Sequence, residues 1–340
     1  MKCEAAFNVK KYITAQNKKV KERVKKNRNL FIEIGGFISQ DLHASRVLPG
    51  YAPNTKLLIL KSLKDADFVY CVNSKDIESN RKRMKGEGEL LEDFVINDLE
   101  TITSIGIKKP HIALTMYENE SRIATFQNRL HQLGYKSNTY NLLSSYPNNI
   151  KEVLSPGGFG SYHKIEKKSN MTVILGAGGN SGKMAMAISQ IYLNKLEGRD
   201  SFFTKLETFP VWNIPLNHPV NIAYEFATAN HGDDNSIDLL YKEKTGINAV
   251  TYNRDIKNFE ILRLLLEEIF GKKIFHSPTE MCINMISAGF ENDNTIRAAA
   301  ENEITRRYKF FKMNPKMNPK GITDFERCNE LIKKYNLVLK

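Results

Sequence analysis

Short apolar runs alternate with helix-length amphipathic segments over much of this sequence, and that alternation limits the fold more than any other feature. Helical patterns follow the runs, as in ESRIATFQNRLHQLG (120–134). Because strand–helix–strand units join parallel strands through right-handed crossovers, the sequence predicts an α/β protein with a parallel sheet. The runs with the length and residue content of buried strands are LFIEI (30–34), DFVYCVN (67–73), HIALTMY (111–117) and MTVILG (171–176).

Glycine, proline and polar residues gather at 144–163 and interrupt this pattern. Such a cluster is typical of a domain or subdomain boundary. We therefore expect three parts. They are 1–150, an N-terminal helix and a Rossmann-like α/β lobe; 151–250, a second α/β lobe with a P-loop-like strand, turn and helix; and 251–340, a mainly helical segment.

The net charge of +12 is unevenly distributed. Lys and Arg gather in the segments 10–28 and 304–320, and the rest of the chain is close to neutral. This distribution favours solvated helix faces over a long nucleic-acid groove, so we do not expect a nucleic-acid partner.

Redox and targeting signals are also informative. The four cysteines are scattered singly, which argues against a disulfide framework or a Cys-rich zinc site. No apolar run approaches the roughly 20 residues needed to span a bilayer, and the first residues lack the apolar core of a secretory signal. We expect a cytoplasmic protein without a membrane partner.

The most informative motif is the glycine-rich turn after the run at 171–176. In a strand–turn–helix unit, backbone N–H groups and the positive end of the helix point at one place, which favours a phosphate. Glycines let the backbone approach the ligand closely, and a lysine adds a positive charge. The predicted phosphate-binding residues are Gly176, Gly178, Gly179, Asn180, Ser181, Gly182 and Lys183.

The match to a P-loop, G-x-x-x-x-G-K-[ST], is incomplete. Ala177 occupies the first position and Met184 the last, so the hydroxyl that would bind Mg²⁺ is missing and any metal must be held elsewhere. A second interpretation is a dinucleotide fold that binds NAD, with Ser181 in place of the third glycine and Glu207 as the ribose-binding acid. A third is that the turn merely connects strand and helix.

Polar residues also follow the strand at 30–34. Arg46 could clamp a phosphate, and His43 could act as acid or base with Asp41 orienting it. The alternative is a helix cap with salt bridges. We expect Asp41, His43 and Arg46 to line the same pocket as the turn up to Lys183, in a cleft between two lobes.

Metal ligands are sparse in this sequence. His218 and Glu225 are weak candidates, and without a third ligand we predict no metal site.

Three long blocks resemble the bacterial domain-of-unknown-function family 1846: FIEIGGFISQDLHASRVLPGY (31–51), GAGGNSGKMAMAISQIY (176–192) and LETFPVWNIPLNHPVNIAYEFATA (206–229). Members of that family are uncharacterised. The resemblance implies that the missing hydroxyl at Met184 is tolerated, that Asn180 replaces a usual glycine, and that a further C-terminal α/β domain would follow Lys340. Some relatives are labelled zinc proteases, but this sequence has no H-E-x-x-H motif to support that label.

We therefore expect a protein that binds a phosphorylated small molecule, foremost a nucleotide such as ATP or GTP. If it is an enzyme, phosphoryl or nucleotidyl transfer comes first, with Lys183 and Arg46 stabilising phosphate charge and His43 or Asp41 as base. The alternatives are a non-catalytic ligand-binding or assembly protein, including a homo-oligomer, and an NAD-type dinucleotide binder.

Overall fold

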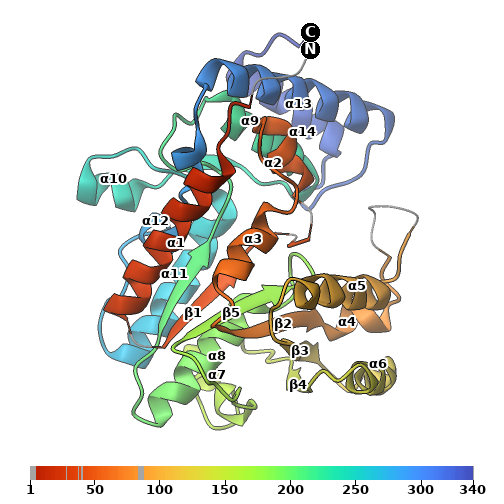
Figure 1. The fold of residues 1–340 in the computed structure, drawn as a ribbon, viewed down its shortest axis with the longest axis vertical. Helices are drawn as coiled ribbons and strands as arrows, with labels where there is room; N and C mark the ends of the chain where they lie inside the picture. Colours follow the sequence, from red (N-terminus) through yellow and green to blue (C-terminus); the bar gives the residue numbers. More distant parts are fainter. Residues whose placement is uncertain (1–4, 28, 37, 40, 83–87, 340) are drawn as a thin grey trace.

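Seven strands form one parallel sheet at the centre of the computed structural model, which describes residues 5–27, 29–36, 38–39, 41–82 and 88–339 (Figure 1). The order across the sheet is β4-β3-β2-β5-β1-β6-β9. The predicted α/β class and parallel sheet are confirmed. The strands are β1 (Leu30–Ile34), β2 (Asp67–Asn73), β3 (His111–Tyr117), β4 (Ser137–Asn141), β5 (Met171–Gly176), β6 (Phe202–Leu206) and β9 (Cys282–Ile283).

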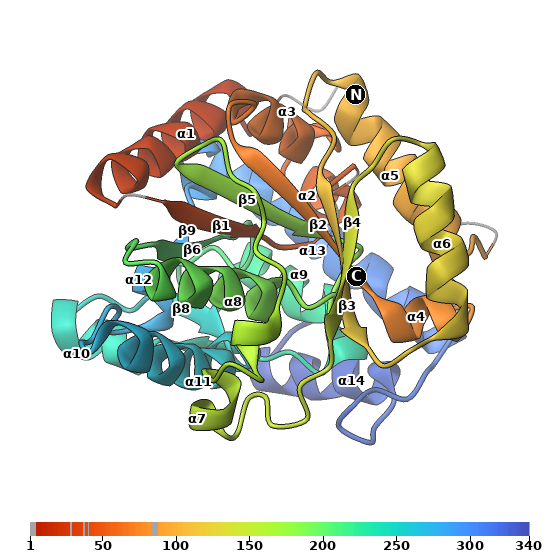
Figure 2. The ribbon, with the colours of Figure 1, turned by 90° about the horizontal axis from the view of Figure 1, so that it is seen from below.

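Helices cover both faces of this sheet, and Figure 2 shows α1 and α3 on one side and α8 and α11 on the other. A short antiparallel pair, β7 (Asn235–Ile237) and β8 (Val250–Tyr252), lies outside the main sheet. The helices are α1 (Val9–Lys26), α2 (Leu42–Val47), α3 (Thr55–Ser62), α4 (Ser74–Glu78), α5 (Leu91–Ser104), α6 (Ser121–Gln132), α7 (Ile150–Val153), α8 (Lys183–Leu196), α9 (Pro219–Ala227), α10 (Leu239–Thr245), α11 (Asn253–Phe270), α12 (Pro278–Met281), α13 (Asp293–Met313) and α14 (Asp324–Tyr335).

Strand residues alternate between two hydrophobic cores, as the period of two in a strand requires. Ile32 and Ile34 of β1 belong to the core under α1, α3, α5 and α6. Phe31 belongs to the core under α8 and α11, together with Phe203 of β6. Glu33 and Lys205 continue these two strands with the same parity, so their side chains start on the face that α8 and α11 cover.

The connections leave the carboxyl edge of the sheet in two directions. From β1 the chain moves outward through β2 and β3 to β4, and it then returns to place β5 between β1 and β2. From β5 it crosses β1 in the other direction to reach β6. The breaker-rich stretch at 144–163 therefore lies in the connection from edge to centre, and strands from both predicted α/β lobes share one sheet. Where neighbouring connections diverge in this way, open α/β sheets have a crevice at the strand ends.

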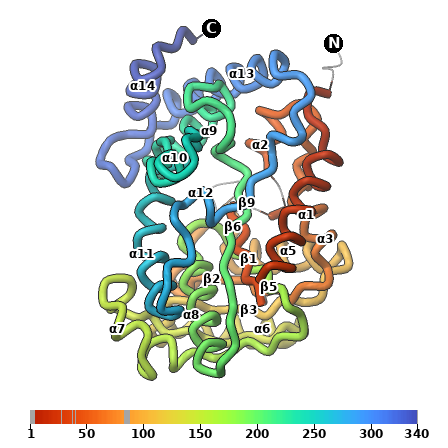
Figure 3. The backbone as a smooth tube through the Cα atoms, turned by 90° about the vertical axis from the view of Figure 1, so that its left-hand side faces the viewer, coloured from red at the N-terminus to blue at the C-terminus, as the bar shows by residue number. Residues whose placement is uncertain are grey.

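Helices α11, α13 and α14 make up much of the C-terminal part of the chain, and α13 packs against α9, α2 and α14 (Figure 3). Asn292 caps the start of α13, and a capping box at Thr323 starts α14. Within the part of the chain that the structure describes, no helix combines the length and apolarity needed to cross a membrane.

Candidate functional site

The glycine-rich turn lies at the carboxyl edge of the sheet, between β5 and α8. Its backbone alternates in handedness, with positive φ at Gly178 (117°), Asn180 (59°) and Gly182 (79°) but not at the residues between them. Such alternation turns successive N–H groups toward one side and forms a concavity that suits an anion. Asn tolerates the left-handed conformation better than most residues, which explains how Asn180 can adopt a φ of 59°.

Neighbouring strands hold the turn in place. The Thr115 hydroxyl at the end of β3 lies 3.0 Å from the Ser181 carbonyl oxygen, and the Asn73 amide at the end of β2 donates to the Asn180 carbonyl at 3.3 Å. The fit is tight, because a Cβ at Gly176 would lie 2.3 Å from the Ser181 hydroxyl. The shape of the turn is therefore fixed by the residues around it.

Lys183 is the first residue of α8 and is buried against the turn. Its ammonium donates to the Gly178 carbonyl oxygen at 2.9 Å and to the Ser181 hydroxyl at 3.2 Å. An ammonium has three N–H donors, so one remains for a ligand. Lys183 thus stabilises the turn, and its positive charge is held in a fixed position there.

A buried ion cluster lies two strands away, at the end of β6. The Lys205 ammonium is 2.5 Å from Glu207, 2.6 Å from Asp255 and 3.0 Å from the Tyr252 hydroxyl. Burial and the nearby Asp255 raise the pKa of Glu207 to about 6, although Lys205 opposes the shift. Burial lowers the pKa of Lys205, but Asp255 and Glu207 raise it well above its ordinary value, so Lys205 stays charged.

Glu33 lies between the turn and this cluster. It stands beside Ile174 of β5 on one side and beside Lys205 of β6 on the other. The residue is 8% exposed, and among the described residues its carboxylate has no hydrogen-bond or ion-pair partner. Its charge reaches both Lys205 and Glu207, since it contributes to the pKa shifts of both.

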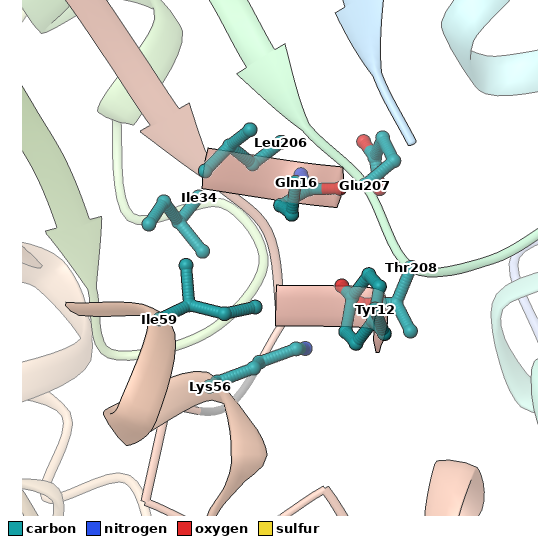
Figure 4. A pocket seen from close by; sticks show the side chains of 8 residues that line it. All are labelled: Tyr12, Gln16, Ile34, Lys56, Ile59, Leu206, Glu207 and Thr208. Atoms are coloured by element: carbon teal, nitrogen blue, oxygen red, sulfur yellow. The ribbon is translucent and has the colours of Figure 1, made fainter. Parts of the chain in front are cut away.

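Two glycines end β1 close to charged groups on other elements. A Cβ at Gly35 would lie 3.4 Å from a Glu207 carboxylate oxygen, and one at Gly36 would lie 2.9 Å from the Lys56 ammonium. Lys56 itself donates to the Gly35 carbonyl oxygen at 3.2 Å. Figure 4 shows Lys56 and Glu207 lining a cavity of about 10 Å³, room for roughly one water.

Asp41, His43 and Arg46, the other predicted catalytic residues, have partners of their own. Asp41 accepts from the Ala44 N–H at the start of α2 and pairs with Lys56 at 3.0 Å. Arg46 bonds Glu303 of α13 at 2.9 Å. This is the helix-cap and salt-bridge arrangement that the sequence left open as the alternative.

His43 is buried beside the same glutamate. Its ring lies 5.0 Å from the Phe209 ring, and burial lowers its pKa, so it is neutral at pH 7. Neither ring nitrogen has a hydrogen bond, and Nδ1 is 3.7 Å from Glu303. The expectation that His43, Asp41 and Arg46 share a pocket with the turn stays a prediction.

The two weak metal candidates bind different groups. His218 caps α9 and pairs with Asp293 at 3.0 Å. Glu225 is buried and pairs with Lys334 at 2.9 Å. Across the described ranges, no three His, Cys, Asp or Glu side chains are arranged to hold a metal ion.

A larger surface hollow, of about 510 Å³, lies at the opposite, amino end of the strands. Lys164, Lys167 and Arg199 line it, and Glu197 pairs with both Lys164 and Arg199. The basic groups there are partly neutralised and lie on connecting segments. The carboxyl edge combines a shaped backbone with buried charge and is the better candidate site.

The sequence is similar to one protein family and to proteins of several organisms. The family model described as "Domain of unknown function DUF1846, N-terminal" matches residues 5–336. A UPF0371 protein of Fusobacterium nucleatum is 40% identical over 323 residues, which is 94% of this chain and 63% of the relative. Similar proteins of Corynebacterium aurimucosum (37% identical; 95% of this chain, 65% of the relative) and Streptococcus equi subsp. equi (39%; 89% and 62%) also carry the UPF0371 name. The chain thus spans a little under two thirds of the length of these curated relatives.

Proposed function

This chain belongs to the DUF1846 family, and we propose that it binds a phosphorylated small molecule, foremost a nucleotide, at the turn 176–183. The observation that carries the proposal is the alternating backbone of the turn at Gly178, Asn180 and Gly182. It gathers N–H donors at the positive end of α8, which has 14 residues and a substantial dipole. The remaining N–H of Lys183 adds a charge-assisted donor at the same place.

A P-loop-like role suits the structure better than an NAD-type dinucleotide role. In a dinucleotide fold the ribose-binding acid ends the strand next to the glycine strand. Here β1 separates β5 from β6, so Glu207 lies two strand spacings, or about 10 Å, to the side. Glu207 is also engaged by Lys205. We therefore propose ATP or GTP as the ligand ahead of NAD.

The reaction proposed for this site is phosphoryl or nucleotidyl transfer. A turn that stabilises phosphate charge can support phosphoryl or nucleotidyl transfer, because those reactions depend mainly on positioning and electrostatics. Two carboxylates that could move a proton lie on the neighbouring strands: Glu33 is in β1, and Glu207 directly follows β6. Turnover of ATP or GTP by the pure protein would distinguish an enzyme from a binding protein.

Binding is tested by calorimetry with ATP, GTP, NAD and sugar phosphates. We expect ATP or GTP to bind more tightly than NAD, and Lys183→Ala to weaken that binding at least about tenfold, the loss of one charge-assisted contact. Lys195→Ala is the matched control, since Lys195 lies on the same helix and forms only an exposed pair with Asp200. Equal affinity in Lys183→Ala and the wild type would remove the proposal.

A further inference from the structure

We propose that the phosphate ligand binds together with a divalent cation, Mg²⁺ or Mn²⁺, and that the Glu33 carboxylate is the protein's contribution to the cation. This inference rests on the proposed function of the turn and adds a specific partner for the phosphate. It assigns a role to a carboxylate on the strand beside the turn.

Glu33 is in the right place for this role. It lies on β1, the immediate neighbour of β5, and is paired in register with Ile174, two residues before the turn begins. Its parity with Phe31 puts the side chain on the face covered by α8, the helix that the turn starts. The Glu33 side chain therefore starts on the face of the sheet that is covered by the helix following the turn.

Glu33 also lacks a partner, although it is more than nine tenths buried. Carboxylates of such largely buried residues are usually paired or bind a metal. The nearest cation along the sheet, Lys205, is already shared by Glu207 and Asp255. Lys205 is therefore engaged by two other carboxylates and does not pair with Glu33.

A second unpartnered polar atom points to the same region. The hydroxyl of Tyr146 is buried without a hydrogen bond. Burial raises the pKa of Tyr146, and the charge of Glu33 raises it further, so the two groups are within electrostatic reach.

A phosphate alone would be repelled by Glu33, whereas a cation between them satisfies both charges. Mg²⁺ typically takes one or two carboxylates and completes its octahedron with ligand phosphates and water. Such coordination needs few protein ligands, which agrees with the finding that no three His, Cys, Asp or Glu side chains among the described residues are arranged to hold a metal ion. It also explains how the site can function with Met184 where a P-loop has a hydroxyl ligand: the oxygen ligand comes from the neighbouring strand.

The test is calorimetric titration of ATP into wild type and Glu33→Gln, each with Mg²⁺ and with EDTA. We expect Mg²⁺ to strengthen ATP binding to the wild type about tenfold or more and to leave Glu33→Gln unaffected. We further expect Glu33→Gln to bind metal-free ATP several-fold more tightly than the wild type, because a like charge beside the phosphates is gone. Damage to the fold would weaken binding in both conditions and cannot produce that gain.

The matched control is Glu118→Gln, which removes an exposed acid that follows β3 and pairs with Lys75. It should behave like the wild type with and without Mg²⁺. If ATP binds and needs Lys183, but Mg²⁺ acts equally on wild type and Glu33→Gln, the cation site is wrong and the phosphate site stands. If ATP binds to no variant in either condition, both the phosphate site and the cation site are overturned.

Discussion

Replacing Lys205 with Met should destabilise the protein in a strongly pH-dependent way. Lys205 is the single ammonium between Glu207 and Asp255, at 2.5 and 2.6 Å. Methionine keeps most of the side-chain volume and removes only the charge. Two buried carboxylates then face each other without a cation, and removing one partner of a buried pair costs about 3–5 kcal/mol.

The pH dependence follows from the carboxylates. In the wild type the pKa of Glu207 is already raised to about 6, and Lys205 is the group that holds it down. Without Lys205 that pKa rises further, so folding favours the protonated acid. A carboxylate whose pKa is raised in the folded state does not lower the free energy of unfolding below its unfolded pKa. Above that pKa it lowers the free energy of unfolding by up to about 1.4 kcal/mol for each pH unit. We expect the loss in Lys205→Met to be below about 2 kcal/mol at pH 5 and to reach about 3–5 kcal/mol at pH 8.

The assay is equilibrium urea denaturation followed by circular dichroism at both pH values. Lys136→Met is the control, because Lys136 and Glu166 form a pair in which both side chains are more than four fifths exposed. Exposed pairs contribute about 0–1 kcal/mol. The reasoning would be refuted if Lys205→Met lost the same stability at pH 5 and pH 8, or no more than the control.

Three further outcomes test other parts of the structure. Gly182→Ala should lower the free energy of unfolding, measured by urea denaturation, by about 2–4 kcal/mol, because the position has a positive φ and the new Cβ would lie 2.7 Å from Thr115. Gly198→Ala, at a position with positive φ in open space, should lower it by only about 1–2 kcal/mol. Wild-type stability should fall by about 2 kcal/mol between pH 4.5 and 7 through Glu207, and Glu207→Gln should lack that component; an unchanged pH profile in the variant would contradict the assignment. Burial raises the pKa of Glu303, but Arg306 and its other partners hold that pKa well below its ordinary value. Glu303→Gln should therefore lower the free energy of unfolding by about 3–5 kcal/mol at pH 7, and the difference from the wild type should narrow below pH 4.5.

Local pattern was enough to locate most elements of the sheet. The runs at 30–34, 67–73 and 111–117 are strands with those bounds, because buried strands and amphipathic helices leave periodic signals within a few residues. Strand order leaves no such signal. Nothing in MTVILG says that it inserts between β1 and β2 rather than starting another sheet, and β9, with two residues, is too short for a periodic pattern.

The sequence likewise predicts one part of the candidate site and not the other. The turn could be found because its proposed function depends on backbone conformation, and glycines in a sequence indicate unusual backbone conformations. The ion cluster around Lys205 could not be predicted from the sequence. Lys205 lies inside an ordinary-looking strand, and its partner Asp255 is 50 residues away and reads as a helix N-terminal charge. Arg46 was assigned to phosphate from its place after a strand, but it bonds Glu303, which lies 257 residues later.

The two glycines after β1 bear on the proposal that the turn and the acids bind one ligand. The turn comes from β5 and the acids from β1 and β6, so a ligand that touches both must lie over the end of β1. A side chain at Gly35 or Gly36 would stand in that space, 3.4 Å from Glu207 in one case and 2.9 Å from Lys56 in the other. Gly36 also has a φ of 73°, which lets the chain turn away from the edge at once. The glycine pair therefore leaves positions 35 and 36, which lie between the turn after β5 and Glu207 after β6, without a side chain.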